Sequence, residues 1–291
     1  MSKTAWVFPG QGSQCLGMGA GLADTTMGKE KFAVAEEILG WSVLQVCDQE
    51  EDKLNQTVYT QPCLYAIETI LVDLYKGKGK NADLVAGHSL GEYSALYTAN
   101  VYDFEDGLRL VKRRGELMSQ AQGGKMVALM KFDRQLLEDA VNSHGEVVIA
   151  NDNSDGQVVI SGTPDGVDQV LEQVGAKKTV ELKVSGAFHS PLMSGAAQEF
   201  AKVLDNINFR DASVPIMSNV DPLPTVKGAE IKHRLLRQMT GGVRWREIML
   251  ALGSHGISDV VEIGPGKVLS GLIKRTDKTL NLINIATVED M

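Results

Sequence analysis

Residues 84–92 read Leu-Val-Ala-Gly-His-Ser-Leu-Gly-Glu, an apolar run that leads directly into a Gly-X-Ser-X-Gly turn. The pattern is typical of a nucleophile elbow, in which a strand reverses sharply into a helix and a serine stands at the tip. Gly87 and Gly91 lack side chains, so the backbone can close on both sides of Ser89. Such a pentapeptide also occurs as a plain glycine turn. The apolar run before it and the helix formers of residues 90–99 after it favour the elbow.

The chain has 291 residues, of which 43% are hydrophobic, so it can bury a sizeable core in one large domain, alone or with a smaller one. No window approaches about 18 consecutive apolar residues, and the N-terminus lacks the apolar segment of a signal peptide. We therefore expect a cytoplasmic protein that does not span a membrane. Cys15, Cys47 and Cys63 have neither metal-ligand nor CxxC spacing, so we expect reduced thiols, no metal site and no bound cofactor.

The formal net charge of −8 argues against general affinity for nucleic acids, which depends on neutralising phosphates. Basic residues are nevertheless concentrated in residues 107–115 and 231–246, which contain no acidic residue. Two interpretations of these two basic clusters stay open. They form solvated helix faces, or they form a positive rim for an anionic ligand or an acidic protein partner. We expect a monomer that meets any such partner transiently.

Strand-like and helical segments alternate along most of the chain. Residues 61–75 have the periodicity of an amphipathic helix, with Pro62 in its first turn. Residues 103–119 predict a long helix with Asp103 as its N-cap. Strand patterns outside the central part of the chain occur at residues 4–8, 84–87, 214–218, 259–263 and 281–285. We therefore predict an α/β-hydrolase-like fold with a parallel sheet covered on both faces.

The pattern of predicted secondary structure changes after residue 124. Short strand-like runs and two helical stretches follow in the order β-α-β-β-α-β, which is that of a ferredoxin-like unit. We therefore predict a small ferredoxin-like α+β domain at residues 125–189. It is inserted into a large discontinuous domain, which comprises residues 1–124 and 190–291.

A serine at such an elbow needs a base that accepts its proton. His189 is the best candidate of five histidines, because it lies between a predicted strand and a predicted helix. No carboxylate occupies an obvious strand end between Ser89 and His189, which leaves a backbone carbonyl to orient the imidazole. The N–H groups of Leu90 and Gln11 are the candidate oxyanion donors. Gln11 lies in a Gly-Gln-Gly loop without the spacing of a nucleotide-binding loop.

Six motifs follow one another through the whole chain. They are Phe-Pro-Gly-Gln-Gly-Ser-Gln at 8–14, Thr-Gln-Pro at 60–62, Gly-His-Ser-Leu-Gly-Glu at 87–92, Arg-Arg-Gly at 113–115, Gly-Ala-Phe-His-Ser at 186–190 and Glu-Ile-Gly-Pro-Gly-Lys at 262–267. This series resembles that of malonyl-CoA:acyl carrier protein transacylases. One departure is Gly-Val-Arg-Trp at 242–245, because family members often have proline at its first position.

The resemblance implies an acyltransferase that moves malonyl from malonyl-CoA to the phosphopantetheine thiol of acyl carrier protein, through an ester on Ser89, and so supplies fatty-acid synthesis. It also implies that His189 is the base and that Gln11 and Leu90 form the oxyanion hole. The further residues that it implies are the carboxylate-binding Arg114, the site-lining Gln61, Phe188 beside the substrate α-carbon, and Arg244, whose carbonyl orients the base. Because arginine binds a carboxylate through two parallel hydrogen bonds, such a site would reject acetyl groups.

Other functions stay open on the residues alone. A serine esterase or thioesterase would use the same elbow, with water as the acceptor and no need for Arg114. A catalytically silent module that docks a carrier protein would function without Ser89. A stand-alone acyltransferase that serves a polyketide synthase is a further alternative, since the motifs do not identify the acceptor.

Overall fold

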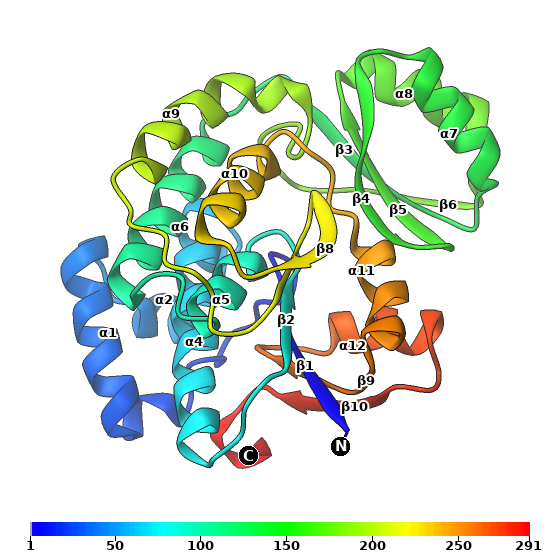
Figure 1. Cartoon of the computed structure of the whole chain (residues 1–291). Helices are drawn as coiled ribbons and strands as arrows, with labels where there is room; N and C mark the ends of the chain where they lie inside the picture. Colours follow the sequence, from blue (N-terminus) through cyan, green and yellow to red (C-terminus); the bar gives the residue numbers. More distant parts are fainter. Residues whose placement is uncertain (1) are drawn as a thin grey trace.

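The computed structural model describes residues 2–291 as a larger α/β unit and a smaller α+β unit (Figure 1). The strands of the larger unit are β1 (Lys3–Phe8), β2 (Leu84–Gly87), β7 (Ile216–Ser218), β8 (Asp221–Thr225), β9 (Ile257–Ile263) and β10 (Asn281–Ile285). They form one sheet in the order β10-β9-β1-β2-β7-β8. All neighbours are parallel except β7 and β8, which are antiparallel. The predicted parallel sheet is therefore confirmed.

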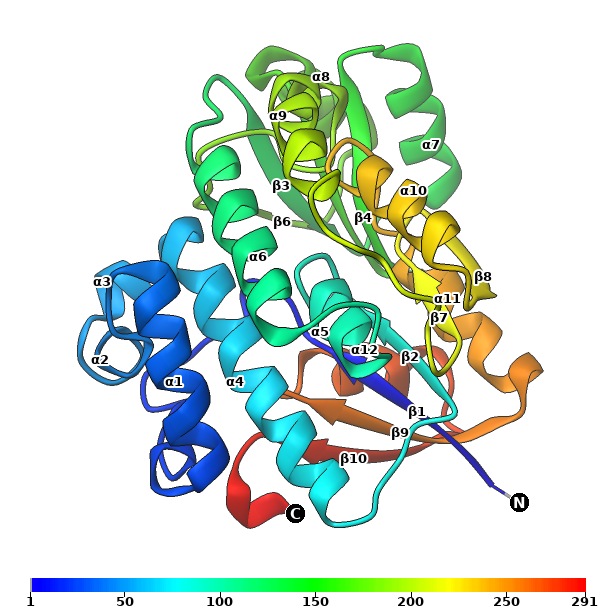
Figure 2. The same ribbon diagram turned by 60° about the vertical axis from the view of Figure 1, so that its left-hand side comes forward.

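Helices cover both faces of this sheet. They are α1 (Thr26–Leu39), α2 (Val43–Gln49), α3 (Glu51–Leu54), α4 (Thr57–Gly77), α5 (Gly91–Thr98), α6 (Phe104–Ser119), α9 (Ser194–Leu204), α10 (Gly228–Gln238), α11 (Trp245–Leu252) and α12 (Val268–Thr276). In β1, Trp6 and Phe8 face the side of α4 and α6, which lie side by side in Figure 2, while Ala5 and Val7 face α11 and α12. Within residues 2–291, none of the helices combines the length and apolar character needed to cross a bilayer.

The smaller unit has the predicted order of elements. It contains β3 (Lys125–Met130), α7 (Arg134–Ser143), β4 (Val147–Ser154), β5 (Gln157–Gly162), α8 (Pro164–Val174) and β6 (Lys178–Glu181). Its antiparallel sheet has the order β4-β5-β3-β6. In β3, Val127 and Leu129 face α7 and α8, whereas Met126 and Ala128 join the core of the larger unit. The exact division at residues 124/125 and 189/190 stays a prediction.

One detail of the predicted helices is wrong. Helix α4 begins at Thr57, so Pro62 lies inside the helix and not in its first turn. Asp103 is the N-cap residue of α6, as predicted, but its side chain accepts no N–H group of the helix. It pairs instead with Arg210, at 2.7 Å, because a residue distant in sequence competes for the carboxylate.

The elbow is present as predicted. β2 ends at Gly87, α5 begins at Gly91, and Ser89 between them has a φ of 52°. A Cβ atom on Gly87 would lie 2.0 Å from the carbonyl carbon of Gly91, and one on Gly91 would lie 2.1 Å from the Phe8 oxygen. No side chain therefore fits at either position. The second contact also places the end of β1, and the loop that carries Gln11, directly against the elbow.

Candidate active site

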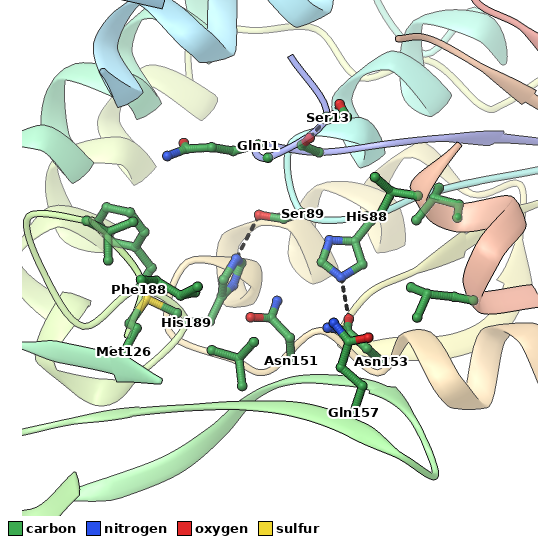
Figure 3. A pocket seen from close by; sticks show the side chains of 18 of the residues that line it. Gln11, Ser13, His88, Ser89, Met126, Asn151, Asn153, Gln157, Phe188 and His189 are labelled. Atoms are coloured by element: carbon green, nitrogen blue, oxygen red, sulfur yellow. Dashed lines mark hydrogen bonds between the residues drawn. The ribbon is translucent and has the colours of Figure 1, made fainter. Parts of the chain in front are cut away.

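The elbow serine and the predicted base form a hydrogen bond. Ser89 Oγ lies 2.7 Å from His189 Nε2 (Figure 3). His189 follows β6 in the chain and, like Ser89, has a positive φ, of 56°. Such a conformation costs about 1–3 kcal/mol for a residue other than glycine, and persists only where its surroundings impose it. The surrounding structure therefore fixes the backbone of both Ser89 and His189, and with it the direction in which each side chain leaves the chain.

Two backbone carbonyls orient His189. Its Nδ1 lies 2.9 Å from the Gln238 oxygen and 3.1 Å from the Gly241 oxygen. Carbonyl oxygens only accept, so Nδ1 carries the proton and Nε2 accepts the serine hydroxyl. The prediction that the Arg244 carbonyl orients the base is wrong, because that oxygen accepts the Ile248 N–H in the first turn of α11. Gln238 ends α10, where helical carbonyls lack partners inside the helix.

His189 is neutral in this site. Burial is the main cause, and the charge of Arg114 adds to it, so the pKa of His189 falls from 6.5 to about 3. The hydrogen bonds to Gln238 and Gly241 act in the opposite direction but are smaller. A neutral imidazole is the form that can accept a proton from serine.

Arg114, on α6, is a buried cation whose hydrogen-bond partners are all neutral. It is 1% exposed. Nη1 donates to Gln61 Oε1 at 2.8 Å, and Nη2 donates to Ser89 Oγ at 3.0 Å and to Gln238 Oε1 at 3.2 Å. Within residues 2–291, no carboxylate oxygen lies within 4.0 Å of this guanidinium. Burial lowers the pKa of Arg114, but a guanidinium remains charged at any ordinary pH.

The two other side chains that were expected to meet the substrate occupy different positions. Phe188 is buried and lines the pocket beside Met126 (Figure 3). Gln61 is fully buried behind Arg114 and is not part of the pocket lining. Its Nε2 contacts Met118 Sδ at 3.3 Å, while its oxygen accepts Arg114. The expected site-lining position of Gln61 is therefore wrong: it holds Arg114 from behind.

The candidate oxyanion donors are the N–H of Leu90, which follows Ser89 in the elbow, and the N–H of Gln11 in the first loop. A Cβ atom on Gly10 would approach the His88 oxygen to 2.4 Å, so the first loop packs tightly on the elbow. Within residues 2–291, neither the Leu90 N–H nor the Gln11 N–H donates to a protein acceptor. Unused backbone donors beside a nucleophile are what an oxyanion hole requires.

The site opens into a pocket between the two units. The smaller unit contributes part of the lining, namely Met126, Asn151, Asn153 and Gln157, which Figure 3 labels, and also Val159. His88 Nε2 lies 2.8 Å from Asn153 Oδ1 and so joins the elbow to the smaller unit. The smaller unit therefore forms one wall of the site.

A polar network behind the elbow was not recognised from the sequence. Gln238 Nε2 donates to the Ser89 oxygen at 2.9 Å and to Glu92 Oε2 at 2.7 Å. Asn219 accepts the Ser89 N–H at 2.7 Å and donates to the Gly87 oxygen at 2.6 Å. Glu92 was visible as the last residue of the elbow stretch, but Gln238 and Asn219 belong to no recognisable motif.

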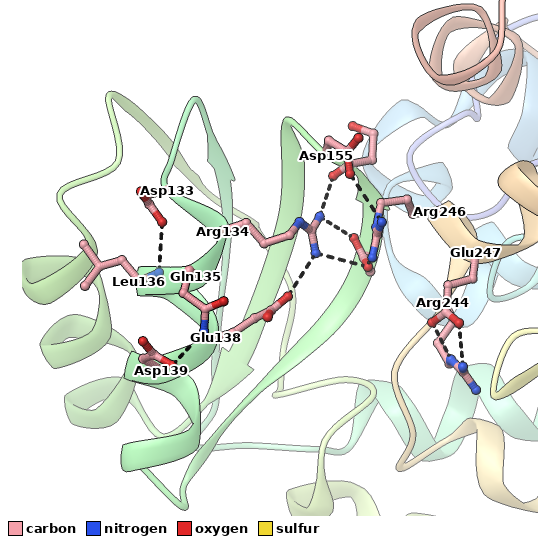
Figure 4. Close-up of polar contacts among 12 residues, drawn as sticks. Asp133, Arg134, Gln135, Leu136, Glu138, Asp139, Asp155, Arg244, Arg246 and Glu247 are labelled. Carbon is pink, nitrogen blue, oxygen red and sulfur yellow. Dashed lines mark hydrogen bonds and ion pairs between the residues drawn. The ribbon is translucent and has the colours of Figure 1, made fainter.

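Most side chains of the two basic clusters are neutralised by acidic residues. The pairs, with N–O distances of 2.5–3.3 Å, are Arg109–Asp106, Arg113–Glu116, Lys232–Asp205, Arg234–Glu230, Arg244–Glu247 and Arg246–Asp152. Figure 4 shows the Arg244–Glu247 pair and Arg246, which also pairs with Asp155. Arg237 is exposed, and no ion pair in the described part of the chain includes it.

Comparison with known proteins gives consistent matches over the full length. A family model described as an acyl transferase domain matches residues 5–290. The malonyl CoA-acyl carrier protein transacylase of Synechocystis sp. (strain PCC 6803) is 58% identical over 289 residues, which are 99% of each chain. The crystal structure of a Synechocystis malonyl-CoA:ACP transacylase, also 58% identical, has a TM-score of 0.97 and covers 99% of this chain and 98% of its own. A malonyl-transacylase in complex with a type II PKS acyl-carrier protein is 39% identical, with a TM-score of 0.94, and covers 99% and 97%.

The chain belongs to the acyl transferase domain family, and it is an acyltransferase. The family model spans nearly all residues, and the structure agrees with it, because a histidine is hydrogen-bonded to the serine of a nucleophile elbow. Within that class, it is similar to malonyl CoA-acyl carrier protein transacylases along its whole length. The resemblance found in the six motifs is therefore confirmed.

Proposed function

We propose that this acyltransferase moves malonyl from malonyl-CoA to the phosphopantetheine thiol of an acyl carrier protein. The observation that carries the proposal is the position of Arg114 Nη2, 3.0 Å from Ser89 Oγ. A cation without an acidic partner stands beside the atom that would carry the acyl group. It favours an acyl group with its own carboxylate. The similarity to malonyl CoA-acyl carrier protein transacylases supports this substrate, and the solved complex of a related transacylase with a carrier protein supports the acceptor.

In the first half-reaction, Ser89 Oγ attacks the thioester carbonyl of malonyl-CoA while His189 Nε2 takes its proton. The oxyanion that forms accepts hydrogen bonds from the Leu90 and Gln11 N–H groups. The C–S bond then breaks, and the His189 imidazolium returns the proton to the departing CoA sulfur. The products are free CoA and a malonyl ester on Ser89.

The second half-reaction repeats these steps in reverse with a new thiol. His189 takes the proton of the phosphopantetheine thiol as its sulfur attacks the ester carbonyl. Ser89 then leaves and recovers that proton from His189. Arg114 holds the malonyl carboxylate through both halves, which keeps the carbonyl beside the oxyanion donors.

Intact-protein mass spectrometry after mixing with malonyl-CoA tests the covalent intermediate. We expect one malonyl adduct that peptide mapping assigns to Ser89, and none on Ser89→Ala. Adding holo carrier protein should move the adduct to the carrier faster than water removes it. An adduct that persists on Ser89→Ala contradicts the role of Ser89, and rapid loss to water without carrier supports the esterase or thioesterase alternative.

The acceptor is the carrier protein either of fatty-acid synthesis or of a polyketide synthase. We favour the carrier of fatty-acid synthesis, because the 58% identical Synechocystis relative is named without a polyketide pathway, whereas two transacylases named for polyketide biosynthesis are 41% and 40% identical. The complex with a type II PKS carrier shows that a related transacylase meets a polyketide acceptor. Parallel assays with the two kinds of carrier protein distinguish the alternatives.

Arg237 is the proposed contact for an acidic carrier protein. It precedes Gln238 at the end of α10 and keeps an exposed charge. We expect Arg237→Glu to lower kcat/KM for the carrier about three- to tenfold and to weaken its salt dependence. Steady-state kinetics at several ionic strengths measure both quantities.

Lys29→Glu is the matched control, because it makes the same charge change at an exposed position on α1, away from the pocket lining. An equal effect of both substitutions would attribute the result to net charge and would contradict docking at Arg237. Lys232, in the same basic cluster, is a weaker candidate for this contact, because it pairs with Asp205 at 3.0 Å.

A further inference from the structure

A carboxylate and a guanidinium are buried behind the elbow with one amide between them. Glu92 and Arg114 are each 1% exposed, and Gln238 is fully buried. Gln238 Nε2 donates to Glu92 Oε2 at 2.7 Å, and Gln238 Oε1 accepts from Arg114 Nη2 at 3.2 Å. The two opposite charges thus share a neutral spacer and do not touch.

The amide of Gln238 can adopt only one orientation in this arrangement. A carboxylate only accepts hydrogen bonds and a guanidinium only donates them, so the NH₂ group must face Glu92 and the oxygen must face Arg114. The same NH₂ group also donates to the Ser89 oxygen at 2.9 Å. Asn219 N–H donates to Glu92 Oε2 at 3.1 Å and fixes the carboxylate in turn. The elbow, the carboxylate and the guanidinium therefore share one set of hydrogen bonds.

Because Gln238 lies between Glu92 and Arg114, the site can meet two requirements that a direct Glu92–Arg114 ion pair could not meet together. A buried cation with no anion nearby is costly, so Arg114 needs a counter-charge in the free enzyme. A carboxylate in contact with Arg114 would occupy the hydrogen-bond donors that an incoming substrate carboxylate needs. Glu92 lies close enough to act electrostatically, while Gln238 keeps it off the guanidinium.

We infer that Glu92 and Gln238 are positioning residues for acyl-group selection: Glu92 balances the charge of Arg114 through Gln238 and leaves the guanidinium available for the carboxylate of the acyl group. This inference rests on the proposed malonyl transfer. Burial raises the pKa of Glu92, whereas the hydrogen bonds from Gln238 and Asn219 and the charge of Arg114 oppose that rise and favour the anion.

An exchange of the two side chains tests the inference. Glu92→Gln combined with Gln238→Glu keeps the total charge and volume, and an amide at 92 can still donate to a carboxylate at 238. The carboxylate would then touch Arg114. A carboxylate at 238 no longer donates to the Ser89 oxygen, which slows malonyl and acetyl transfer alike, so the readout is their ratio. We expect kcat/KM for malonyl transfer relative to that for acetyl transfer to fall about 100-fold, with a rise in KM for malonyl-CoA. Thermal unfolding near that of the wild type checks that the variant folds.

A merely structural role for the pair predicts that the exchange keeps malonyl selectivity, and that result would overturn the inference. Adduct formation on the wild-type enzyme distinguishes failure of the inference from failure of the proposed function. If the wild type gives no malonyl ester on Ser89, the proposed function is contradicted. A wild-type ester together with an exchange variant of unchanged selectivity contradicts the inference alone.

Glu92→Gln by itself gives a second test that introduces no new group at position 238. It removes an anion near the acyl carboxylate site, so free malonate should bind the variant about three- to tenfold more tightly than the wild type, by calorimetry. Equal or weaker binding of malonate would overturn the inference.

Discussion

Replacing His189 with alanine is expected to slow acylation of Ser89 at least about 10⁴-fold. The imidazole is 2.7 Å from the hydroxyl, and its proton is fixed on the opposite nitrogen by the two carbonyls, so Nε2 is preset to accept. Without it, the serine proton has no acceptor and the leaving thiolate has no donor. Rapid-quench measurement of the acyl-enzyme gives the rate.

The pH profile of the wild type is the second readout of this prediction. Because the pKa of His189 falls to about 3, the free enzyme keeps the neutral imidazole as the pH falls through 6.5, and kcat/KM should show no inflection there. Folding stability should behave differently: the unfolded chain takes up the proton below about 6.5, so this histidine's contribution is complete above that pH and is lost progressively below it.

His144→Ala is the matched control, since His144 contacts Gln173 on the smaller unit and no group of the site. It should leave the acylation rate unchanged. An inflection of kcat/KM near pH 6.5 that disappears in His189→Ala would contradict a neutral, buried base in the free enzyme.

Replacing Arg114 with alanine should reduce malonyl transfer about 10⁴-fold while acetyl transfer falls much less. The wild-type guanidinium, which is 1% exposed, supplies two hydrogen bonds and a charge. A malonyl carboxylate in the variant would be buried beside neutral amides only. Competition between malonyl-CoA and acetyl-CoA, followed by mass spectrometry of the Ser89 ester, measures the ratio directly.

Arg114→Lys separates charge from geometry. A lysine keeps the charge but not the planar fork, so we expect a loss smaller than that of Arg114→Ala. Equal losses of malonyl and acetyl transfer in Arg114→Ala would show that the arginine acts on the serine or on stability, and would contradict the carboxylate clamp. Thermal unfolding of both variants checks stability.

Much of the fold could be predicted because its signals are local. The apolar run before Gly87 and the helix formers after Gly91 are enough to indicate a strand, a turn and a helix. Strand β8 was missed, because Pro222 and Pro224 argue against a strand. The structure places it at the edge of the sheet, where proline is tolerated since one side of the strand needs no partner.

The sequence predicted the main catalytic side chains correctly but not the groups that orient or neutralise side chains, and these errors have one cause. Ser89, His189 and Arg114 carry functional groups in recognisable motifs, and the structure brings them together. The carbonyl that orients the base was assigned to Arg244, but any residue has a carbonyl, so no sequence pattern marks the correct one. The sequence also could not show whether the side chains of the basic clusters are neutralised, because acidic partners such as Asp205 and Asp152 come from other segments.

The sequence by itself determined the class of the enzyme, because the elbow glycines, the nucleophile and the base are residue types whose chemistry can be recognised from their order and spacing in the chain. Only the tertiary structure decided which groups surround them. The Gln238 carbonyl and amide, the Glu92 carboxylate and the wall formed by the smaller unit reach Ser89 from distant parts of the chain. Their effects on charge and orientation depend on distances and burial, which arise only when the chain is folded.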